Sequence, residues 1–380
     1  MPRFFHLADL HLGRVFHGES LLEDQSHILE LVVNQVKAER PDAVILAGDL
    51  FDRAVPPAGA MALLDEFMSS LAEAGVAVAA IPGNHDSAPR LGYASKAWER
   101  LGVHIRTDYT RLNDPVRLES RDGLGLDIFA LPFIETAALR SKLGLETGDR
   151  LSLMRAALEG MKSARDSRRP AVLAAHEFVA GSAESGSERL YVGGSSSVPA
   201  ELLDGFDYVA LGHIHGAQGA GDAMIRYSGS PMAYSFDESG RDKGYMDVTL
   251  DPSQLYPEVR FRPLEPLHPL VIVEDSLGNI LGSPEYDQLR ESYVSVRIND
   301  GLSHLNLIGR LRERFPLLRE LRQLALESFG EREVSQPSSV ETPQNLFADF
   351  LDFAGWTDQD QRTMAEAYFH DAVSAGEGES

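Results

Sequence analysis

Short apolar segments alternate with segments of helical periodicity through the first half of the chain. Apolar runs at residues 3–8, 43–47 and 76–81 predict strands. Between them, residues 26–37 and 61–71 place apolar side chains three and four positions apart, as on one face of a helix. The buried stripe expected in the second helix is Met61, Leu64, Met68 and Leu71. This β-α-β-α-β order predicts an α/β fold with a mainly parallel sheet and right-handed crossovers.

A third helical segment is followed by two further apolar strands. The helix is expected near residues 152–161, and the strands at residues 171–174 and 208–211. Residues 181–197, which lie between these strands, are rich in glycine and serine and predict a long surface loop.

The sequence changes in character after about residue 250. Prolines cluster over residues 252–269, which is typical of a linker. Strands are then expected at residues 271–273 and 293–298, and a helix at residues 305–315. Residues 317–326 have a helical rhythm but also fit a strand, and the pattern leaves both open.

A second linker, framed by Pro337 and Pro343, precedes two amphipathic segments at residues 346–353 and 361–373. Their apolar face is large for a solvated helix, which suggests a groove on a partner. It comprises Leu346, Phe347, Phe350, Leu351, Phe353 and Trp356. The chain is therefore divided into a large domain over residues 1–255, a small domain over residues 264–330 and a helical segment over residues 340–375.

The composition is that of an ordinary globular protein with two or three domains, at 380 residues and 43% hydrophobic. No apolar run approaches the roughly 20 residues of a membrane span. Asp9 interrupts the first apolar stretch and no small-residue cleavage site follows, so no signal peptide is expected. The lack of cysteine excludes disulfides, thiolate zinc sites and a cysteine nucleophile. These features predict a cytoplasmic protein.

The net charge of −23, from 35 basic and 58 acidic residues, argues against a protein that binds nucleic acid by charge alone. It does not exclude phosphate chemistry, because bound cations can dominate a local field. The acidic residues are also unevenly distributed along the chain, since residues 327–380 hold 12 acidic and 2 basic side chains.

Each of the five apolar strands of the first domain ends in aspartate, asparagine or histidine. The segments are Asp9-Leu10-His11, Gly48-Asp49-Leu50-Phe51-Asp52, Gly83-Asn84-His85-Asp86, His176 and Gly212-His213-Ile214-His215. Taken singly, each fits a turn, a helix cap or a core histidine. In an open α/β sheet, however, the carboxyl ends of the strands face one crevice. Seven nitrogen and oxygen donors in one crevice are too many for a single ion and predict two.

The order of the strands suggests how the donors are shared. Asp49 follows the middle strand and is the natural bridge between two cations. We expect one ion on Asp9, His11, Asp49 and His215, and the other on Asp49, Asn84, His176 and His213. Asp9 and His11 are two apart and should project from one side of an extended chain, as should His213 and His215. Glycines before Asp49, Asn84 and His213 allow sharp turns and close backbone approach.

The donor types narrow the choice of metal and of reaction. Imidazole, carboxylate and amide oxygen without sulfur favour Mn²⁺ or Fe²⁺ over Mg²⁺, with Zn²⁺ possible, and Mn²⁺ is the first expectation. Two ions about 4 Å apart suit in-line displacement at phosphorus. His85, beside Asn84, is expected to protonate the leaving oxygen as general acid. Asp86 either orients His85 or caps the following turn.

Seven further histidines fall outside these motifs and are expected to be structural. They are His6, His17, His27, His104, His268, His304 and His370. His17 is the nearest to an exception, because it closely follows the first motif. A basic run after the third helix is expected to be a solvated helix end, with contact to nucleic acid as the alternative. This run is Lys162, Arg165, Arg168 and Arg169.

The five motifs, in this order over residues 9–215, resemble those of the calcineurin-like metallophosphoesterases. A closer resemblance, to the nuclease subunits of bacterial DNA-end-processing complexes, is carried by residues 8–13, 47–52, 208–215, 225–231 and 235–238. The resemblance implies a two-sheet sandwich flanked by helices, a small α+β capping domain and C-terminal helices that grip an ATPase partner. It also implies that residues 317–326 form a strand of the cap.

The activity implied by the resemblance is Mn²⁺-dependent exonuclease cleavage of double-stranded DNA ends and endonucleolytic opening of hairpins, in repair, recombination and replication. It assigns the seven donors as metal ligands and His85 as the acid. It further implies a homodimer, through the first two helices, within a heterotetramer that contains the ATPase.

Two other functions remain open. A two-metal phosphatase or small-nucleotide phosphodiesterase would use the same metals. A non-catalytic scaffold would dock an ATPase through residues 346–373 and keep its metals for structure.

Overall fold

The computed structural model describes residues 1–120, 123–183, 197–300 and 307–324 and, near the end of the chain, seven single residues. These are Phe347, Leu351, Arg362, Thr363, Ala365, Tyr368 and Phe369. The chain forms two units, Met1–Ile298 with Leu302–Arg322, and Asn299–Gly301 with Gln323–Ser380. Most of the two predicted amphipathic segments, and of the glycine- and serine-rich loop, lies outside the described residues.

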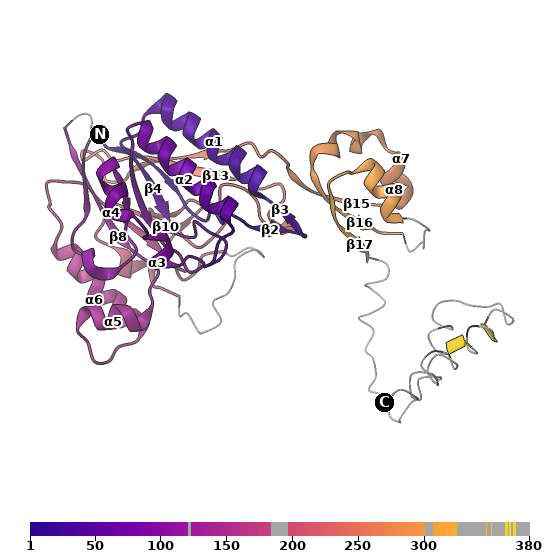
Figure 1. Ribbon diagram of the computed structural model, residues 1–380. Coiled ribbons are helices and arrows are strands. Elements are labelled where there is room, and N and C mark those ends of the chain that lie inside the picture. The colour runs from indigo at the N-terminus through magenta and orange to yellow at the C-terminus, as the bar shows by residue number, and fades with distance from the viewer. Residues whose placement is uncertain are drawn as a thin grey trace, which may run out of the picture. The chain divides into compact units, whose positions relative to one another are not determined.

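Two six-stranded sheets form the core of the first unit (Figure 1). The first has the strand order β14-β13-β1-β4-β5-β6, in which β1, β4, β5 and β6 are mutually parallel. β13 is antiparallel to β1, and β14 is antiparallel to β13. Its strands are β1 (Arg3–Leu7), β4 (Ala43–Ala47), β5 (Ala77–Ile81), β6 (Val103–Ile105), β13 (Gly244–Thr249) and β14 (Glu258–Pro263).

The second sheet has the order β11-β12-β10-β9-β8-β7, with β8, β9, β10 and β12 parallel and an antiparallel strand at each edge. Its strands are β7 (Val116–Glu119), β8 (Gly125–Leu131), β9 (Ala171–His176), β10 (Tyr208–Gly212), β11 (Gln218–Ala220) and β12 (Asp222–Tyr227). β9 and β10 pair with each other and with β8 and β12, not with β5, so the five predicted strands are divided between two sheets. The two-sheet sandwich implied by the resemblance is confirmed.

The two sheets pack face to face through apolar side chains. Phe4 and Ile45 of the first sheet share a core with Val172 and Tyr208 of the second. The rings of Phe4 and Tyr208 meet edge to face with centroids 5.5 Å apart. Burial on both faces explains why these strands are continuous apolar runs.

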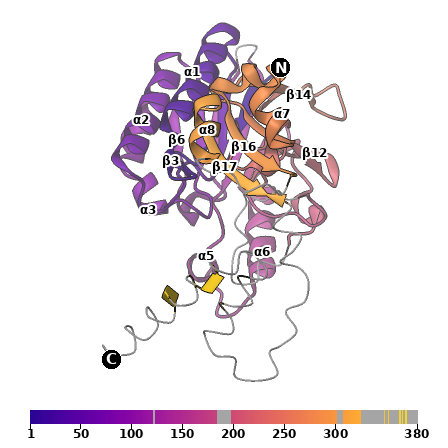
Figure 2. The same ribbon diagram turned by 90° about the vertical axis from the view of Figure 1, so that its right-hand side faces the viewer.

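Helices cover the outer faces of the sandwich. α1 (Leu22–Glu39) and α2 (Ala58–Glu73) lie side by side over the first sheet (Figure 2), and α5 (Thr136–Leu143) and α6 (Arg150–Ser163) pack on the second. In α2 the predicted stripe is buried except for Met61, which is 53% exposed because Ala60 and Phe67 face the sheet. The short helices are α3 (Ala88–Leu91), α4 (Ser95–Trp98), η1 (Glu99–Leu101), η2 (Tyr109–Arg111), η3 (Ala200–Leu203) and η4 (Phe236–Glu238).

A small module follows the sandwich and has its own core. Its sheet is β15-β16-β17 and its core includes Val294, Val296, Leu311 and Phe315. The elements are β15 (Leu270–Asp275), α7 (Leu277–Gly282), η5 (Pro284–Glu291), β16 (Tyr293–Ile298), α8 (Leu307–Arg314) and β17 (Leu318–Gln323). The segment that the sequence left open is thus a strand, because α8 ends before Pro316 and the next residues pair with β16.

A hairpin of two short strands, β2 (Val15–Phe16) and β3 (Glu19–Ser20), joins the loop after β1 to α1. Among the described residues, no helix has the length and apolar character needed to cross a membrane.

Candidate metal centre

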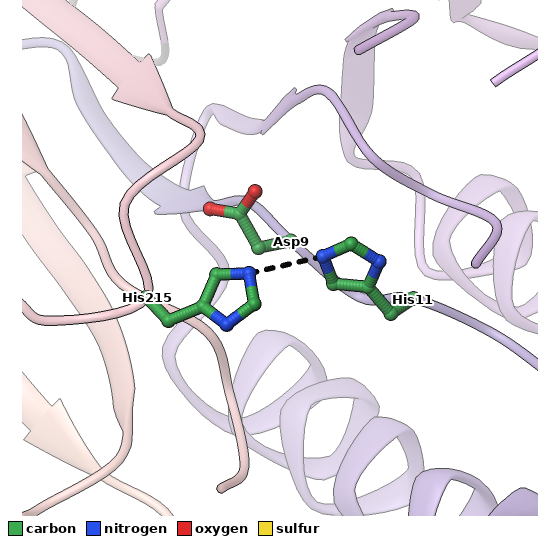
Figure 3. Close-up of side chains that lie close together, drawn as sticks. All are labelled: Asp9, His11 and His215. Atoms are coloured by element: carbon green, nitrogen blue, oxygen red, sulfur yellow. Dashed lines mark hydrogen bonds between the residues drawn. The ribbon is translucent and has the colours of Figure 1, made fainter. Parts of the chain in front are cut away.

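The predicted ligands meet at the carboxyl ends of strands from both sheets. Asp9, His11 and His215 form one group whose donor atoms lie within 4.8 Å of one another, and Asp9, Asp49 and His176 form another. In the first group the Nε2 atoms of His11 and His215 face each other at 3.0 Å, beside the carboxylate of Asp9 (Figure 3). Two imidazoles that bind one cation at about 2.1 Å would have a similar nitrogen separation.

Asp49 lies between the groups, at the position expected of a bridging carboxylate. Its Oδ2 is 3.4 Å from His176 Nε2, 3.7 Å from His11 Nε2 and 4.0 Å from His85 Nε2. Its Oδ1 accepts a hydrogen bond from the backbone N–H of His85 at 2.8 Å. One carboxylate therefore faces three imidazoles, from the loops after β1 and β5 and from the end of β9.

Asn84 and His213 complete the second group. The amide oxygen of Asn84 lies 3.0 Å from His176 Nε2 and 3.2 Å from His213 Nδ1. The other ring nitrogen of His176, Nδ1, donates to the carbonyl oxygen of Ala47 at 2.9 Å. That bond fixes the ring so that Nε2 faces Asn84 and Asp49, an arrangement common behind metal-binding histidines.

The loops that carry these residues adopt an unusual backbone conformation. Asp9, His11 and Asp49 have φ values of 55°, 43° and 51°, and His213 has 103°. The prediction that these side chains project from an extended chain is therefore wrong, because Asp9, His11 and His213 have positive φ values. The amides of Asp9 and His11 still bond across to the carbonyls of Gly48 and Asp49. Non-glycine residues in such conformations cost of the order of 1–3 kcal/mol each and are concentrated at functional sites.

Three glycines make room for this packing. A Cβ atom would lie 2.3 Å from His176 Nδ1 if added at Gly48, and 2.1 Å from Asp49 Oδ1 if added at Gly83. At Gly212 it would lie 2.1 Å from a backbone carbonyl oxygen. The close backbone approach predicted at these glycines is confirmed.

His85 and Asp86 have separate partners. The ring Nδ1 of His85 donates to the carbonyl oxygen of Asp52 at 2.8 Å, which leaves Nε2 facing Asp49. The carboxylate of Asp86 accepts from the backbone N–H groups of Leu50, Phe51 and Gly83. Asp86 thus joins the loop after β5 to the loop after β4, and these contacts involve neither the His85 ring nor the turn that follows Asp86.

The electrostatics of the cluster favour a buried cation. Burial alone would lower the pKa of His176, but the charge of Asp49 and a hydrogen bond to it raise that pKa to about 10. Burial lowers the pKa of His213 to about 3 and that of His11 well below its usual value. The carboxylates thus hold positive charge in the interior, which is what a divalent ion supplies. With imidazole nitrogen and carboxylate and amide oxygen as donors, the residues suit a divalent metal site.

Metal affinity should depend on pH through Asp9. Burial, reinforced by Asp49 and opposed by His176 and His215, raises the pKa of Asp9 to about 6. A cation needs the ionised carboxylate of Asp9 and the neutral ring of His176, whose pKa is raised to about 10. Affinity should therefore rise with pH throughout this range and fall most steeply below pH 6, where both groups are protonated. Titration calorimetry with Mn²⁺ between pH 5 and pH 8 measures this dependence. An affinity that is equal at pH 5 and pH 7 would contradict it.

Several residues at the centre had no role assigned from the sequence. The Oε1 atom of buried Glu238 lies 3.9 Å from His215 Nδ1, and its carboxylate forms an ion pair with Lys243. Although burial alone would raise the pKa of Glu238, His215 and Lys243 lower it to about 2. Asp52 forms a third group with His11 and His85. Asp52 and Glu238 lie in residues 47–52 and 235–238, two of the segments that carried the family resemblance. That resemblance was the sequence signal by which their roles could have been found.

A charged group behind a ligand histidine orients the ring and raises its basicity. We therefore expect Glu238→Gln to weaken Mn²⁺ binding about tenfold while the protein stays folded. Calorimetry, together with a thermal melt, measures both quantities. Glu30→Gln, on the exposed face of α1, is the matched control and should bind like the unaltered protein.

The remaining histidines and the basic run have structural partners where they are described. His6 is buried between the hydroxyl of Tyr208 at 3.0 Å and the carbonyl of Leu211 at 3.2 Å. The ring of His17 packs on Phe16 and Phe236, away from the cluster. The three arginines of the basic run pair with Asp207, Asp166, Asp127 and Glu119. His304 and His370 lie outside the described residues.

Residues 2–217 match the calcineurin-like phosphoesterases (Metallophos). The match spans more than half of the 380 residues, so the protein belongs to this family and is a hydrolase of phosphate esters. Within the family its particular likeness is to the SbcD subunit of nuclease SbcCD from Staphylococcus epidermidis. The two are 31% identical over 359 residues, which cover 92% of this chain and 94% of that relative. The family and the closer resemblance expected from the motifs are both confirmed.

Two solved structures align with part of the chain. A protein of Thermus thermophilus is 12% identical, with a TM-score of 0.40, and covers 68% of this chain and 98% of its own. A dimetal phosphatase from Danio rerio is 15% identical, with a TM-score of 0.43, and the alignment covers 70% of this chain and 98% of the phosphatase.

Proposed function

We propose that this protein is a Mn²⁺-dependent DNA nuclease, with exonuclease activity on double-stranded ends and endonuclease activity on hairpins. It acts with an SbcC-type ATPase in DNA end processing, repair and recombination, in the cytoplasm. One observation carries the proposal. Donors from five strand ends converge around Asp49 in a chain that aligns with a nuclease subunit over 92% of its length.

In this proposal Asp49 would serve both ions. Asp9, His11, Asp49 and His215 would hold one ion, and Asp49, Asn84, His176 and His213 would hold the other. When bound, two Mn²⁺ ions would neutralise the phosphate and lower the pKa of an attacking water. His85 holds a proton for the leaving oxygen, because its bond to the Asp52 carbonyl aims Nε2 into the cluster.

A cavity beside the centre supports a nucleic acid substrate. It has a volume of about 820 Å³ and reaches from Asn84 to Phe133 and Arg150. The Arg150 guanidinium lies 5.3 Å from the centre of the Phe133 ring and pairs with buried Glu177. An aromatic ring with an arginine beside it suits a nucleobase and its phosphate. The volume is large enough for a nucleotide on one side of the cleaved bond.

Incubation of the purified protein with Mn²⁺ and a blunt DNA duplex, a DNA hairpin or a phosphomonoester tests the proposal. Shortening of the duplex and opening of the hairpin, with slow turnover of the monoester, are expected. Rapid monoester turnover with intact DNA would instead support a two-metal phosphatase. Rapid hydrolysis of a cyclic nucleotide with intact DNA would support a small-nucleotide phosphodiesterase.

The partner proposal concerns residues beyond the first unit. The predicted ligands all lie before residue 216, whereas the apolar segments 346–353 and 361–373 follow the small module. Removing residues 337–380 should therefore leave DNA cleavage within about twofold and abolish co-purification with an SbcC-type ATPase. Retained co-purification would place the partner surface elsewhere. A mass of two chains in light scattering is expected if α1 and α2 form the homodimer of a heterotetramer.

A further inference from the structure

The loop after β1 holds His11 in a strained conformation. Asp9 and His11 have positive φ values of 55° and 43°, and Gly13 follows at 85°. The loop is buried, so its peptide groups need hydrogen-bond partners inside the protein. A backbone this far from its preferred conformation persists only where surrounding contacts hold it.

Gln25, in the first turn of α1, makes three of those contacts. Its Nε2 donates to the carbonyl oxygens of His11 at 2.7 Å and Leu10 at 3.2 Å, and its Oε1 accepts from the N–H of Gly13 at 3.0 Å. The residue is only 2% exposed. A primary amide combines the donors and the acceptor that this loop uses, whereas a carboxylate of the same size lacks the donors.

The preceding residue, Asp24, holds the small module. Its carboxylate, also 2% exposed, accepts from His268 Nδ1 at 2.9 Å and from the hydroxyl of Tyr293 at 2.8 Å. Tyr293 opens β16, and its ring lies 4.7 Å from the guanidinium of Arg319 on β17. Arg319 in turn reaches Glu19 of the hairpin at 3.6 Å. The module is thus fastened to α1 one residue away from the support of the metal-binding loop.

We propose that Gln25 is a positioning residue for His11, and that Asp24 couples this support to the placement of the small module. Adjacent residues of one helical turn cannot move independently, so a displacement of the module that pulls on Asp24 shifts Gln25 and the carbonyl of His11. The proposal rests on the assignment of His11 as a metal ligand. It makes the module a regulator of metal binding at one of the two positions.

The first experiment replaces Gln25 and follows Mn²⁺ binding by calorimetry. Gln25→Glu and Gln25→Leu should each weaken one of two binding events about tenfold and leave the other within twofold. Thermal melts identify the variants that are folded. Gln35→Glu, on the exposed face of the same helix, is the matched control and should bind like the unaltered protein. Unaltered binding of both ions by either folded Gln25 variant would overturn the positioning role.

The second experiment tests the coupling without metal, by hydrogen exchange of the full chain carrying Asp24→Asn. Exchange should rise about tenfold both in the small module and in residues 10–13, whereas the neighbouring exposed Glu23→Gln should change neither. Faster exchange in the module alone, or in neither place, would overturn the coupling. Failure of the nuclease proposal is separate, since it would appear as normal metal binding with uncut DNA in the unaltered protein.

Discussion

Replacing Asp49 with asparagine should reduce hydrolysis at least a thousandfold and remove at least one of the two proposed metal ions. Burial alone would raise the pKa of Asp49, but His176, His11 and His85 hold it well below its usual range. The side chain is therefore a carboxylate at neutral pH. Asparagine has nearly the same shape and can still accept from the N–H of His85, so the substitution removes charge with little change in volume.

Metal content after dialysis against Mn²⁺, and cleavage of a duplex under the same conditions, are the two measurements. Asp65→Asn, on the exposed face of α2, is the control for loss of one carboxylate and should keep both the metal content and the cleavage rate. An Asp49→Asn protein that keeps two ions and cleaves DNA within tenfold of normal would show that no ion depends on this bridge.

His85→Ser should reduce DNA cleavage about 10²–10⁴-fold, the usual contribution of a general acid, and leave the metal content unchanged. The distinguishing substrate is a nitrophenyl ester of thymidine phosphate, whose leaving group departs without a proton. On that ester the loss should be less than about tenfold if His85 acts only as the acid.

The control is His104→Ser, which removes a half-buried histidine that pairs with Glu99 and is remote from the cluster. Equal losses of His85→Ser activity on DNA and on the nitrophenyl ester would mean that His85 binds the phosphate or a metal instead. Loss of metal from the variant would lead to the same conclusion.

Local pattern was sufficient for three strands of the first sheet and for the two amphipathic helices that cover it. Strands β1, β4 and β5 and helices α1 and α2 occur where their apolar spacing predicted them. Pairing between strands was not predictable, because an apolar run reports burial and not the identity of its neighbour. The strand pattern therefore could not show that β9 and β10 belong to a second sheet. Strands β7, β13 and β14 were missed because charged residues interrupt their apolar pattern.

The candidate site shows a similar division. Its donors could be found because each lies where an apolar strand ends, and the glycines beside them fit the observed crowding. The supporting residues could not be found this way. Gln25 lies on α1 and supports His11, whereas Glu238 lies on η4 and supports His215, so neither is part of the loop that it supports. A single buried polar residue also leaves no periodic signal in the sequence. The positive φ of Asp9 and His11 was also hidden, since neither residue type requires it.

The two sheets contribute different ligands to the proposed centre. Asp9, His11, Asp49 and Asn84 follow strands of the first sheet, whereas His176, His213 and His215 belong to strand ends of the second. Bound ions would therefore cross-link the two sheets of the sandwich as well as serve the reaction. With free metal a thousandfold above the dissociation constant, each bound ion adds about 4 kcal/mol to the free energy of unfolding. Removing the metal would therefore lower the free energy of unfolding as well as the activity.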